Sequence, residues 1–310
     1  MNIEKFIAAR AAVIDADLSR RIKKIPDCHP KLREAMLYSV SAGGKRLRPV
    51  LLTAAYELFG GNWRRALPAA CALEMVHTYS LIHDDLPAMD DDSMRRGRLT
   101  NHIVFGEALA VLAGDALLTN AFSVLHGAGS PGGIDSGRVL EAAGILARRA
   151  GAGGMVSGQA ADLEAEGFLA GKRQPAPSRR AKAARLLSYI HRHKTADLII
   201  ASVEMGAVLA GAGAGDRKAL VEFAAAAGLC FQITDDILDV VGDKKKLGKS
   251  GSDERNAKLT YASLYGVGPS RAKAAALLAR AREKLRALSV PPERLEALEG
   301  IAAFVYGREK

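Results

Sequence analysis

Two segments of this chain are apolar on almost every side over several helical turns and then present a group of aspartates. The first segment, residues 66–85, reads ALPAACALEMVHTYSLIHDD, and the second, residues 220–242, reads LVEFAAAAGLCFQITDDILDVVG. A helix that is apolar all round lies inside a bundle of helices. A carboxylate is costly to bury there unless a partner or a metal ion neutralises it. The sequence therefore predicts two central helices whose acids bind cations.

The acids of the second segment fall on one side of its helix. Four polar residues stand at positions i, i+3, i+4 and i+7: Gln232, Asp235, Asp236 and Asp239. This spacing places them on one narrow stripe, where the carboxylates repel one another unless a cation lies between them. Carboxylate oxygens suit Mg²⁺, which is commonly shared with the phosphates of a substrate. A solvent-facing acidic stripe is the alternative, and the apolar remainder of the helix disfavours it.

The acids of the first segment continue into a turn, in the sequence HDDLPAMDDDSMRRG. A proline two residues after Asp85 predicts that the helix ends near Asp85 and that the chain turns before Asp90. Asp84, Asp85 and Asp90 can then converge on one metal ion. Arg95 and Arg96 follow, and guanidinium groups bind phosphate oxygens in pairs. Two such clusters facing each other from different helices predict magnesium ions held around a diphosphate.

The rest of the chain also has helical periodicity, rich in Ala and Leu, with no internal repeat. Helices are expected over residues 31–59, 64–86, 103–126, 137–168, 181–211, 217–241, 270–289 and 293–307. Glycine or proline clusters predict breaks at 43–44, 60–61, 130–133, 174–178, 211–215 and 291–293. No linker separates two parts, so a single all-α domain over residues 1–310 is predicted.

Charge and composition narrow the choice of partner and compartment. The 44 Lys and Arg residues outnumber the 34 Asp and Glu residues, which gives a net charge of +10. Such a charge suits nucleic acid, an anionic membrane surface or a phosphorylated small substrate. Aromatic residues are only 5%, which argues against base stacking and a nucleic-acid partner. No run of 18 apolar residues and no N-terminal signal block occurs, so a cytoplasmic protein without membrane insertion is expected.

Six motifs together resemble those of the trans-prenyltransferases of the polyprenyl synthase family, in the form found in bacterial farnesyl diphosphate synthases. They are SAGGKRLRP (41–49), DDLPAMD (84–90), SGQAAD (157–162), HKTADL (193–198), DDILD (235–239) and KLTY (258–261). The resemblance covers almost the whole chain. It implies an isoprenoid-synthase helical bundle around a central cavity, a homodimer, and three Mg²⁺ ions per site that Mn²⁺ can replace.

The resemblance also implies a role for each matching residue. The magnesium-binding acids would be Asp84, Asp85, Asp90, Asp235, Asp236 and Asp239. The diphosphate of isopentenyl diphosphate would be held by Lys45, Arg48, His77 and Arg96. The allylic diphosphate would contact Arg95, Lys194, Lys249 and Lys258. Thr195 and Gln232 would lie near the developing carbocation. The implied reaction joins isopentenyl diphosphate head-to-tail to dimethylallyl or geranyl diphosphate, by ionisation, condensation and elimination.

Product length depends on the depth of the pocket behind the first acidic motif. Tyr79 and Ser80 stand five and four residues before Asp84, so Tyr79 lies about 7.5 Å back along the helix axis. In similar enzymes an aromatic residue at this position closes the pocket and favours a fifteen-carbon product. Farnesyl diphosphate is therefore the expected product, and a geranylgeranyl diphosphate synthase is the alternative. Tyr79 as ordinary core packing stays open.

Two departures from the family pattern stand out. The motif around Lys194 reads KTADL where the bacterial farnesyl form is more often KTGAL, and Asp197 could lower the effective charge of Lys194 or pair with Arg192. Residues 168–182 form a basic, proline-rich stretch that looks longer than in typical relatives. It is expected to be a plain loop insertion, and a cover for the cavity mouth is the alternative.

Other functions fit the sequence less well. A terpene cyclase shares the magnesium chemistry but needs more aromatic residues and no isopentenyl diphosphate pocket. A non-catalytic prenyltransferase subunit would have lost part of an acidic motif, and both motifs are complete here. A phosphohydrolase that uses His83 and Asp84 as metal ligands would need further His and Asp ligands, and no such set is evident in the sequence.

Overall fold

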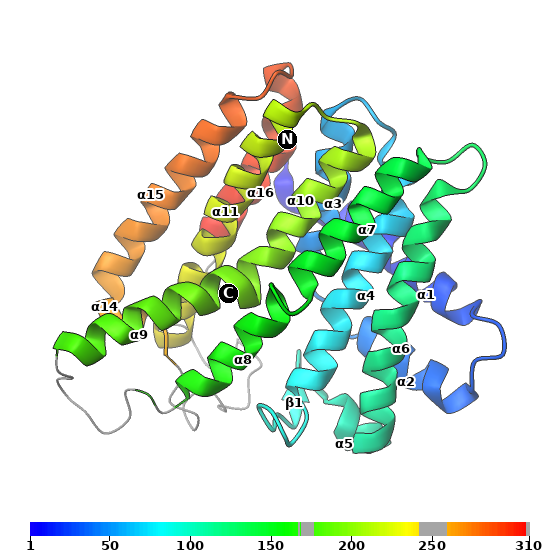
Figure 1. Ribbon diagram of the computed structural model, residues 1–310, viewed down its shortest axis with the longest axis horizontal. Coiled ribbons are helices and arrows are strands. Elements are labelled where there is room, and N and C mark those ends of the chain that lie inside the picture. Colours follow the sequence, from blue (N-terminus) through cyan, green and yellow to red (C-terminus); the bar gives the residue numbers. More distant parts are fainter. Residues whose placement is uncertain (167, 169–176, 242–258, 308–310) are drawn as a thin grey trace. The chain divides into compact units, whose positions relative to one another are not determined.

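The computed structural model describes residues 1–166, 168, 177–241 and 259–307 (Figure 1). The described residues are almost entirely helical, which confirms the all-α prediction, and they divide into two compact units. Unit 1 comprises Met1–Gly144 and Met205–Ala212, and unit 2 comprises Ile145–Glu204 and the described residues from Gly213 onward. Each unit is described by itself below. A single domain over residues 1–310 stays a prediction.

Unit 1 carries the helices of the first half of the chain. They are α1 (Ile3–Lys23), α2 (Pro30–Val40), α3 (Leu47–Leu58), the 3₁₀ turn η1 (Trp63–Ala66), α4 (Leu67–Asp84), α5 (Asn101–Phe105), α6 (Glu107–His126), the 3₁₀ turn η2 (Gly127–Gly129) and α7 (Ser136–Ala150), the last of which runs past the unit boundary. Strands β1 (Met94–Arg95) and β2 (Arg98–Leu99) form a short antiparallel hairpin.

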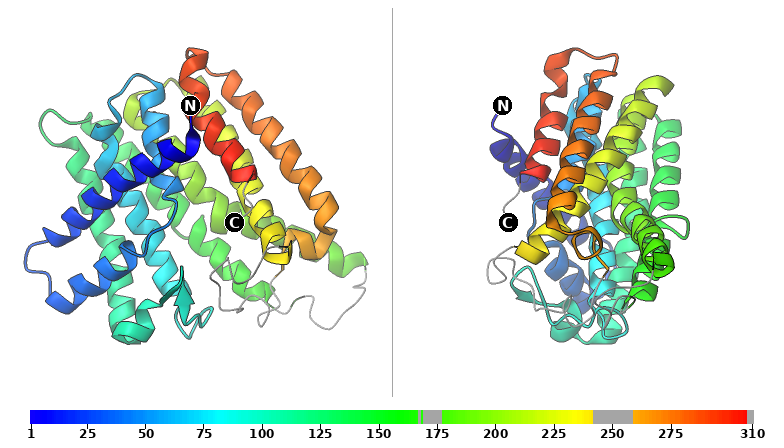
Figure 2. Two further views of the ribbon diagram at one scale, coloured as in Figure 1. Left: turned by 180° about the vertical axis from the view of Figure 1, so that it is seen from behind. Right: turned by 90° about the vertical axis from the view of Figure 1, so that its left-hand side faces the viewer.

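Helix α4 is the centre of unit 1, and α3 and α6 pack along it (Figures 1 and 2). Leu52 of α3, Leu73 of α4 and Leu117 of α6 are completely buried, as expected for three helices that share one apolar core. The first acidic motif thus begins at the end of a core helix, in agreement with the prediction from its apolar sequence.

Unit 2 carries the second acidic motif. Its elements are α8 (Met155–Ala165), α9 (Pro177–Ile190), the π-helical turn η3 (His191–Ala196), α10 (Asp197–Ala210, whose last residues belong to unit 1), α11 (Ala214–Val241), α14 (Tyr261–Tyr265), α15 (Val267–Arg286), the 3₁₀ turn η4 (Pro292–Leu295) and α16 (Glu296–Tyr306). The long helix α11 packs against α15 and α16 (Figures 1 and 2), and Phe223, Leu285 and Leu298 are completely buried.

The predicted helix ranges need several corrections. The range 103–126 is divided between α5 and α6, and α14 lies in none of the predicted ranges. The N-terminal helix α1 was absent from the predicted ranges; Asn2 begins it by accepting a hydrogen bond from the Lys5 backbone N–H at 3.0 Å. The range 137–168 is two helices, because the chain breaks at the glycines of residues 151–154. Gly154 has φ −136° and ψ −124°, which no helical residue adopts. The range 181–211 contains the π-helical turn η3 between two α-helices.

Helix α6 has an apolar face that unit 1 does not cover. The segment Glu107–Gly129 is long and apolar enough to cross a membrane by length and composition, and 33% of its most apolar window is buried. Val111, Leu112 and Phe122 of α6 and Ile103 of α5 are among the exposed large apolar side chains. Asp115 lies within the same helix with its side chain 59% exposed.

Candidate functional site

The first acidic motif folds back on the end of α4. The helix ends at Asp84, as predicted from the proline that follows. The backbone N–H of Asp90 donates to the carbonyl of Asp84 at 2.9 Å, and the N–H of Asp92 donates to the carbonyl of Asp85 at 3.2 Å. Residues far along the turn therefore return to the last turn of the helix. This confirms the predicted turn and brings the backbones of Asp84 and Asp90 together.

The carboxyl group of Asp85 lies in an unfavourable environment for its charge. Asp85 is 3% exposed, and its pKa is raised to about 7, mainly by burial and to a lesser extent by the charges of Asp92 and Asp84. Arg95 opposes this effect by donating from Nε to Asp85 Oδ1 at 2.7 Å. A divalent cation would neutralise the repulsion among these acids. The residues therefore fit the magnesium ion that the sequence predicts.

The ligand set of such an ion would be incomplete without a substrate. Among the residues that the structure describes, no three His, Cys, Asp or Glu side chains form a group that could hold a metal ion. Mg²⁺ usually takes one or two carboxylates and completes its shell with water and substrate phosphates. The arrangement thus fits an ion that binds together with a phosphorylated ligand.

A group of basic side chains lies in the same unit and brings two distant motifs together. Arg48 Nη1 lies 3.1 Å from His77 Nε2. Arg96 donates to the carbonyl of Gly43, and its guanidinium carbon lies 2.8 Å from where a Cβ on Gly44 would be. Glycine is therefore required at residue 44. The segment at 41–49 and the arginines after the first acidic motif meet, as the resemblance implies for an isopentenyl diphosphate site.

His77 is neutral in this basic environment. Burial lowers its pKa well below the usual range, and the charges of Arg48, Arg96 and Arg95 lower it further. A neutral imidazole can accept a hydrogen bond at Nε2, so Arg48 donates to it and the ring proton lies on Nδ1. His77 thus holds Arg48 in place without adding to the positive charge.

Arg46 is a residue of this region for which the sequence predicted no role. Its side chain is 1% exposed and bonds to Asp15 of α1 at 2.7 Å, to Glu74 of α4 at 2.6 Å and to the carbonyl of Val40. Its backbone is left-handed, with φ 48°, at the start of α3. Arg46 therefore anchors the segment that carries Lys45 and Arg48. Glu74, an acid in the apolar middle of α4, was the signal that could have revealed it.

Tyr79 and Ser80 lie on α4 behind the acids. Tyr79 is buried, and its ring meets the His83 ring edge-to-face, with centroids 5.7 Å apart. His83 Nε2 lies 3.1 Å from the Val111 carbonyl of α6, so His83 bonds within the bundle. The Ser80 hydroxyl donates to the His77 carbonyl at 2.9 Å. Tyr79 is therefore buried beside His83, behind the acids of the first motif, where it can limit a pocket.

In unit 2, the three acids of the second motif lie in two different environments. Asp236 is buried, whereas Asp235 and Asp239 are half-buried. Gln232 donates from Nε2 to Asp236 Oδ1 at 3.0 Å, and Thr195 donates to Gln232 Oε1 at 2.6 Å. Thr195 and Gln232 are therefore in contact, as predicted. Gln232 in turn bonds to Asp236.

The π-helical turn η3 positions Lys194 and Thr195. Lys194 Nζ donates to Asp162 of α8 at 2.5 Å, so the SGQAAD segment holds this lysine. Gly158 of the same segment lies against the turn: a Cβ there would be 2.0 Å from the Lys194 backbone nitrogen. A π-helical turn commonly marks a functional site. Lys249 and Lys258 lie outside the described residues, as does most of the 168–182 stretch, residues 169–176.

The expected partners of Asp197 were wrong. Asp197 is buried and bonds to Arg149 Nη1 at 2.8 Å and to His193 Nδ1 at 2.8 Å, and these contacts take up both carboxylate oxygens. The expectation assumed α-helical spacing from Lys194. The π-helical turn changes that spacing, and Lys194 reaches Asp162 of α8 instead.

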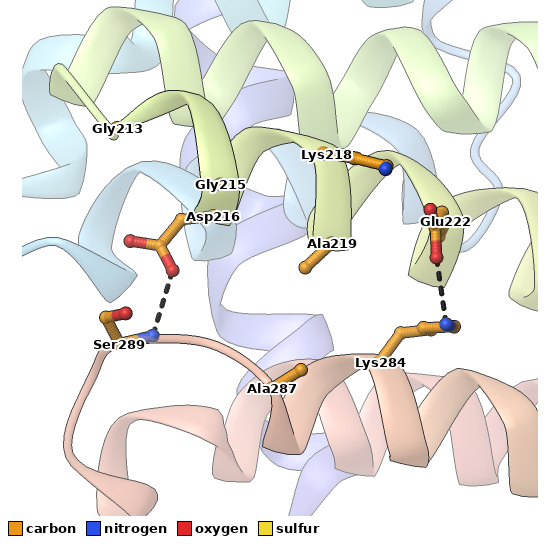
Figure 3. Close-up of a pocket in the computed structure, with 9 residues that line it drawn as sticks. All are labelled: Gly213, Gly215, Asp216, Lys218, Ala219, Glu222, Lys284, Ala287 and Ser289. Carbon is orange, nitrogen blue, oxygen red and sulfur yellow. Dashed lines mark hydrogen bonds and ion pairs between the residues drawn. The ribbon is translucent and has the colours of Figure 1, made fainter.

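Of two cavities in the described residues, one is lined by predicted site residues and the other is not. A small cavity of about 30 Å³ in unit 1, enough for about one water, is lined by Asp85, Arg95 and Arg96 among others. A cavity of about 600 Å³ in unit 2 lies between the N-terminal end of α11 and the C-terminal end of α15 (Figure 3). None of the predicted site residues lines this larger cavity, and its acids are already bonded, Asp216 to the Ser289 N–H and Glu222 to Lys284.

Comparison with known proteins agrees with this arrangement. The sequence pattern of the polyprenyl synthetase family matches residues 29–289. The chain is 44% identical over 292 residues to the farnesyl diphosphate synthase of Geobacillus stearothermophilus, covering 92% of each chain. It is 42% identical over 286 residues to the geranylgeranyl diphosphate synthase of Cyanophora paradoxa, covering 92% of this chain and 90% of that one.

A solved structure extends the likeness to the fold. The apo crystal structure of an FPP/GFPP synthase from Zymomonas mobilis is similar with a TM-score of 0.82 and 33% identity, over 99% of each chain. This likeness confirms the isoprenoid-synthase fold that the motifs imply. With the family pattern matched over most of its length, the chain belongs to the polyprenyl synthetase family.

Proposed function

We propose that this protein condenses isopentenyl diphosphate head-to-tail with dimethylallyl and geranyl diphosphate, and releases farnesyl diphosphate and pyrophosphate. The observation that carries the proposal is the constellation in unit 1, where Asp84, Asp85 and Asp90 stand beside Arg95 and the basic group. Membership of the polyprenyl synthetase family and the name of the Geobacillus relative support the same reaction.

The basic group of unit 1 would bind the diphosphate of isopentenyl diphosphate. Lys45, Arg48 and Arg96 supply positive charge, and the neutral His77 holds Arg48 and offers an N–H at Nδ1. Guanidinium groups match phosphate oxygens in geometry as well as charge. This arrangement orients the double bond of isopentenyl diphosphate for attack.

The acids would hold the metal ions, and the remaining cations would bind the allylic diphosphate. Asp84, Asp85, Asp90, Asp235 and Asp239 are the proposed magnesium ligands. When bound, Mg²⁺ would stabilise the charge of the departing pyrophosphate. Positive side chains assist it, with Arg95 and Lys194 in the described residues and Lys249 and Lys258 outside them. Such preorganised charge commonly contributes more to catalysis than any other effect.

The allylic cation needs an apolar and dry surrounding. The Ala- and Leu-rich helices exclude water, and Thr195 and Gln232 provide polar groups near the cation. The double bond of isopentenyl diphosphate attacks, a carbon–carbon bond forms, and the proton lost from the product passes to pyrophosphate. No side-chain nucleophile is needed.

Product length separates the proposal from its alternative. In a farnesyl diphosphate synthase, Tyr79 would close the pocket behind the first acidic motif. A geranylgeranyl diphosphate synthase would have a deeper pocket, and a relative with that name is similar over most of the chain. The buried ring of Tyr79, which packs against His83 on α4, favours the shorter product.

We also propose a cytoplasmic homodimer, with the exposed face of α5 and α6 covered by a second copy. Ile103, Val111, Leu112 and Phe122 are exposed on these helices. The exposed carboxylate of Asp115 within the same helix argues against a lipid surrounding, where it would cost about 3 kcal/mol. A protein partner can pair or solvate that carboxylate at its rim.

The test is incubation of the purified protein with isopentenyl diphosphate, Mg²⁺ and one primer at a time, followed by mass spectrometry of the products. A fifteen-carbon product from dimethylallyl and geranyl diphosphate, with farnesyl diphosphate unused, is expected. A twenty-carbon product would support the alternative. Absence of condensation with every primer would overturn the proposed function and favour a cyclase or a non-catalytic subunit.

Variants of the acids test the site itself. Asp84→Ala and Asp235→Ala each remove a carboxylate that stabilises the leaving group through the metal. Turnover should fall by about a hundredfold or more, while the circular dichroism spectrum and Tm remain those of a folded protein. Turnover near that of the unchanged protein in either variant would contradict the site assignment.

A further inference from the structure

The carboxylate of Asp236 is enclosed by hydrogen-bond donors. Asp236 is 3% exposed. Its Oδ1 accepts from Gln232 Nε2 at 3.0 Å, and its Oδ2 accepts from the backbone N–H of Tyr261 at 2.6 Å. His191 Nε2 also lies 3.2 Å from Oδ2. Donors from α11 and α14 thus bond to this one side chain, and His191 of η3 lies beside it, a surrounding unlike that of the half-buried Asp235 and Asp239.

These contacts determine which way the Gln232 amide points. An ionised carboxylate only accepts hydrogen bonds, so the group of Gln232 that faces Asp236 must be its NH₂. The amide oxygen then faces Thr195 Oγ1, at 2.6 Å. An amide oxygen cannot donate, so the Thr195 hydroxyl gives its proton to Gln232. The lone pairs of the Thr195 oxygen are left for another neighbour.

His191 supports the same orientation. It is 2% exposed, and its ring stacks on that of Tyr261 with an interplanar angle of 23°. Within the described residues, Nδ1 of His191 is buried and has no hydrogen-bond partner. A buried donor without a partner is costly, so the ring proton lies on Nε2, 3.2 Å from Asp236 Oδ2. His191 therefore presents an N–H to the side of Asp236 that accepts from Tyr261.

We propose that Asp236 is a positioning residue rather than a magnesium ligand, and that it orients Gln232 so that the Thr195 oxygen presents its lone pairs to the allylic cation. This inference rests on the proposed function, because the cation belongs to that reaction. Lone pairs fixed toward a developing positive charge stabilise it without reorganisation. The magnesium ligands of the second motif are then Asp235 and Asp239.

Asp236→Asn tests the orientation directly. The oxygen of the introduced amide must accept from the backbone N–H of Tyr261, so the NH₂ of that amide turns to Gln232. The Gln232 amide then turns over, its NH₂ faces Thr195, and the hydroxyl hydrogen of Thr195 points at the cation. We expect kcat to fall roughly tenfold to a hundredfold, with the Mg²⁺ concentration for half-maximal rate unchanged. Asp235→Asn should instead raise that Mg²⁺ concentration.

A second substitution should restore the orientation. In the double variant Gln232→Glu, Asp236→Asn, the carboxylate introduced at position 232 accepts from both the new NH₂ group at position 236 and the Thr195 hydroxyl. The total charge of this variant is that of the natural protein. We expect kcat to recover at least in part. A role that is merely structural, or a role in metal binding, predicts no such recovery.

Asp17→Asn is the matched control. Asp17 of α1 is a buried aspartate that bonds to Arg20 and Arg21, and neither contact reaches Thr195 or Gln232. This variant should lose stability and keep its kcat when it is measured well below its Tm. If Asp236→Asn does not fold, Gln232→Met breaks the same chain of hydrogen bonds and should lower kcat at an unchanged Mg²⁺ requirement.

The proposal is overturned if Asp236→Asn raises the Mg²⁺ requirement as much as Asp235→Asn does, or if the double variant is no better than Asp236→Asn. It is also overturned if Gln232→Met retains the full kcat. Each of these comparisons requires that the natural protein condenses isopentenyl diphosphate with at least one primer. If the natural protein condenses none of them, the proposed function itself is contradicted, and this outcome is distinct from those above.

Discussion

At the scale of single residues, the two acidic motifs differ in how their charges are balanced. In the first motif Asp85 is buried beside other acids, with Arg95 as its counterion. In the second motif Asp236 accepts hydrogen bonds from Gln232 and from the Tyr261 N–H. A cation would thus relieve repulsion at Asp85, whereas both oxygens of Asp236 already accept hydrogen bonds. The second acid of each motif therefore lies in a different surrounding.

Asp85 should make the stability of the metal-free protein depend on pH. Its pKa is raised from 3.8 to about 7 in the folded protein, so the folded state binds more protons than the unfolded state between these values. The free energy of unfolding contributed by Asp85 therefore falls as the pH rises from about 4 to about 7. Mg²⁺ favours the charged carboxylate, so it should raise the Tm more at about pH 8 than at about pH 6. Asp85→Asn serves as the control and should show little of this difference in thermal denaturation; an unchanged difference would contradict the assignment.

Tyr79 is the residue on which product length is expected to depend. Tyr79→Ala removes a buried ring that packs against His83, and should open space behind the first acidic motif. Mass spectrometry should then find products longer than fifteen carbons. Ser80→Ala is the control, since its hydroxyl only bonds back to the carbonyl of His77. An unchanged product distribution in Tyr79→Ala would show that another wall limits the pocket.

At the scale of elements, the π-helical turn η3 is held from several sides. Lys194 bonds to Asp162 of α8, Thr195 bonds to Gln232 of α11, and His193 bonds to Asp197 at the start of α10. Gly158 allows α8 to approach the backbone of the turn. The turn is therefore positioned by packing and by charge together, which a local helix propensity does not describe.

Gly158→Ala tests the close approach. The added methyl group would lie 2.0 Å from the Lys194 backbone nitrogen, and a backbone cannot move aside as a flexible side chain can. We expect a loss of about 1–3 kcal/mol in the free energy of unfolding and a raised KM for the allylic diphosphate. Gly153→Ala is the matched control, because nothing lies within 4 Å of its added methyl group. Equal stability of the two variants in denaturant titrations would contradict the packing argument.

At the scale of the whole molecule, each unit carries one acidic motif with its own supporting residues. Unit 1 holds the first motif and the basic group anchored by Arg46, and unit 2 holds the second motif and η3. The apolar face of α5 and α6 is not buried in the core of unit 1. We propose that a second copy of the chain covers this face in a homodimer.

Leu112→Glu tests the proposed dimer interface on α5 and α6. Leu112 is 54% exposed on α6, and a carboxylate there would be costly to bury in an interface. Size-exclusion chromatography with light scattering should show a mass near 32.8 kDa for the variant and twice that value for the natural protein. Tyr306→Glu on α16, at a residue that is 38% exposed, is the control and should stay dimeric. A natural protein that is monomeric at every concentration would overturn the proposed dimer.

The sequence alone predicted the fold class, the family and the turn of the first acidic motif. These predictions depend on apolar periodicity, on the proline after Asp85 and on the order of six motifs, which can all be read from residues close together in the sequence. The partners of Arg46, Asp197 and Asp236 were not predictable in this way, because each depends on residues brought close by the packing of other helices. Burial and hydrogen-bond direction are properties of the packed chain. They make Asp236 differ from Asp235 although the two are neighbours in the sequence.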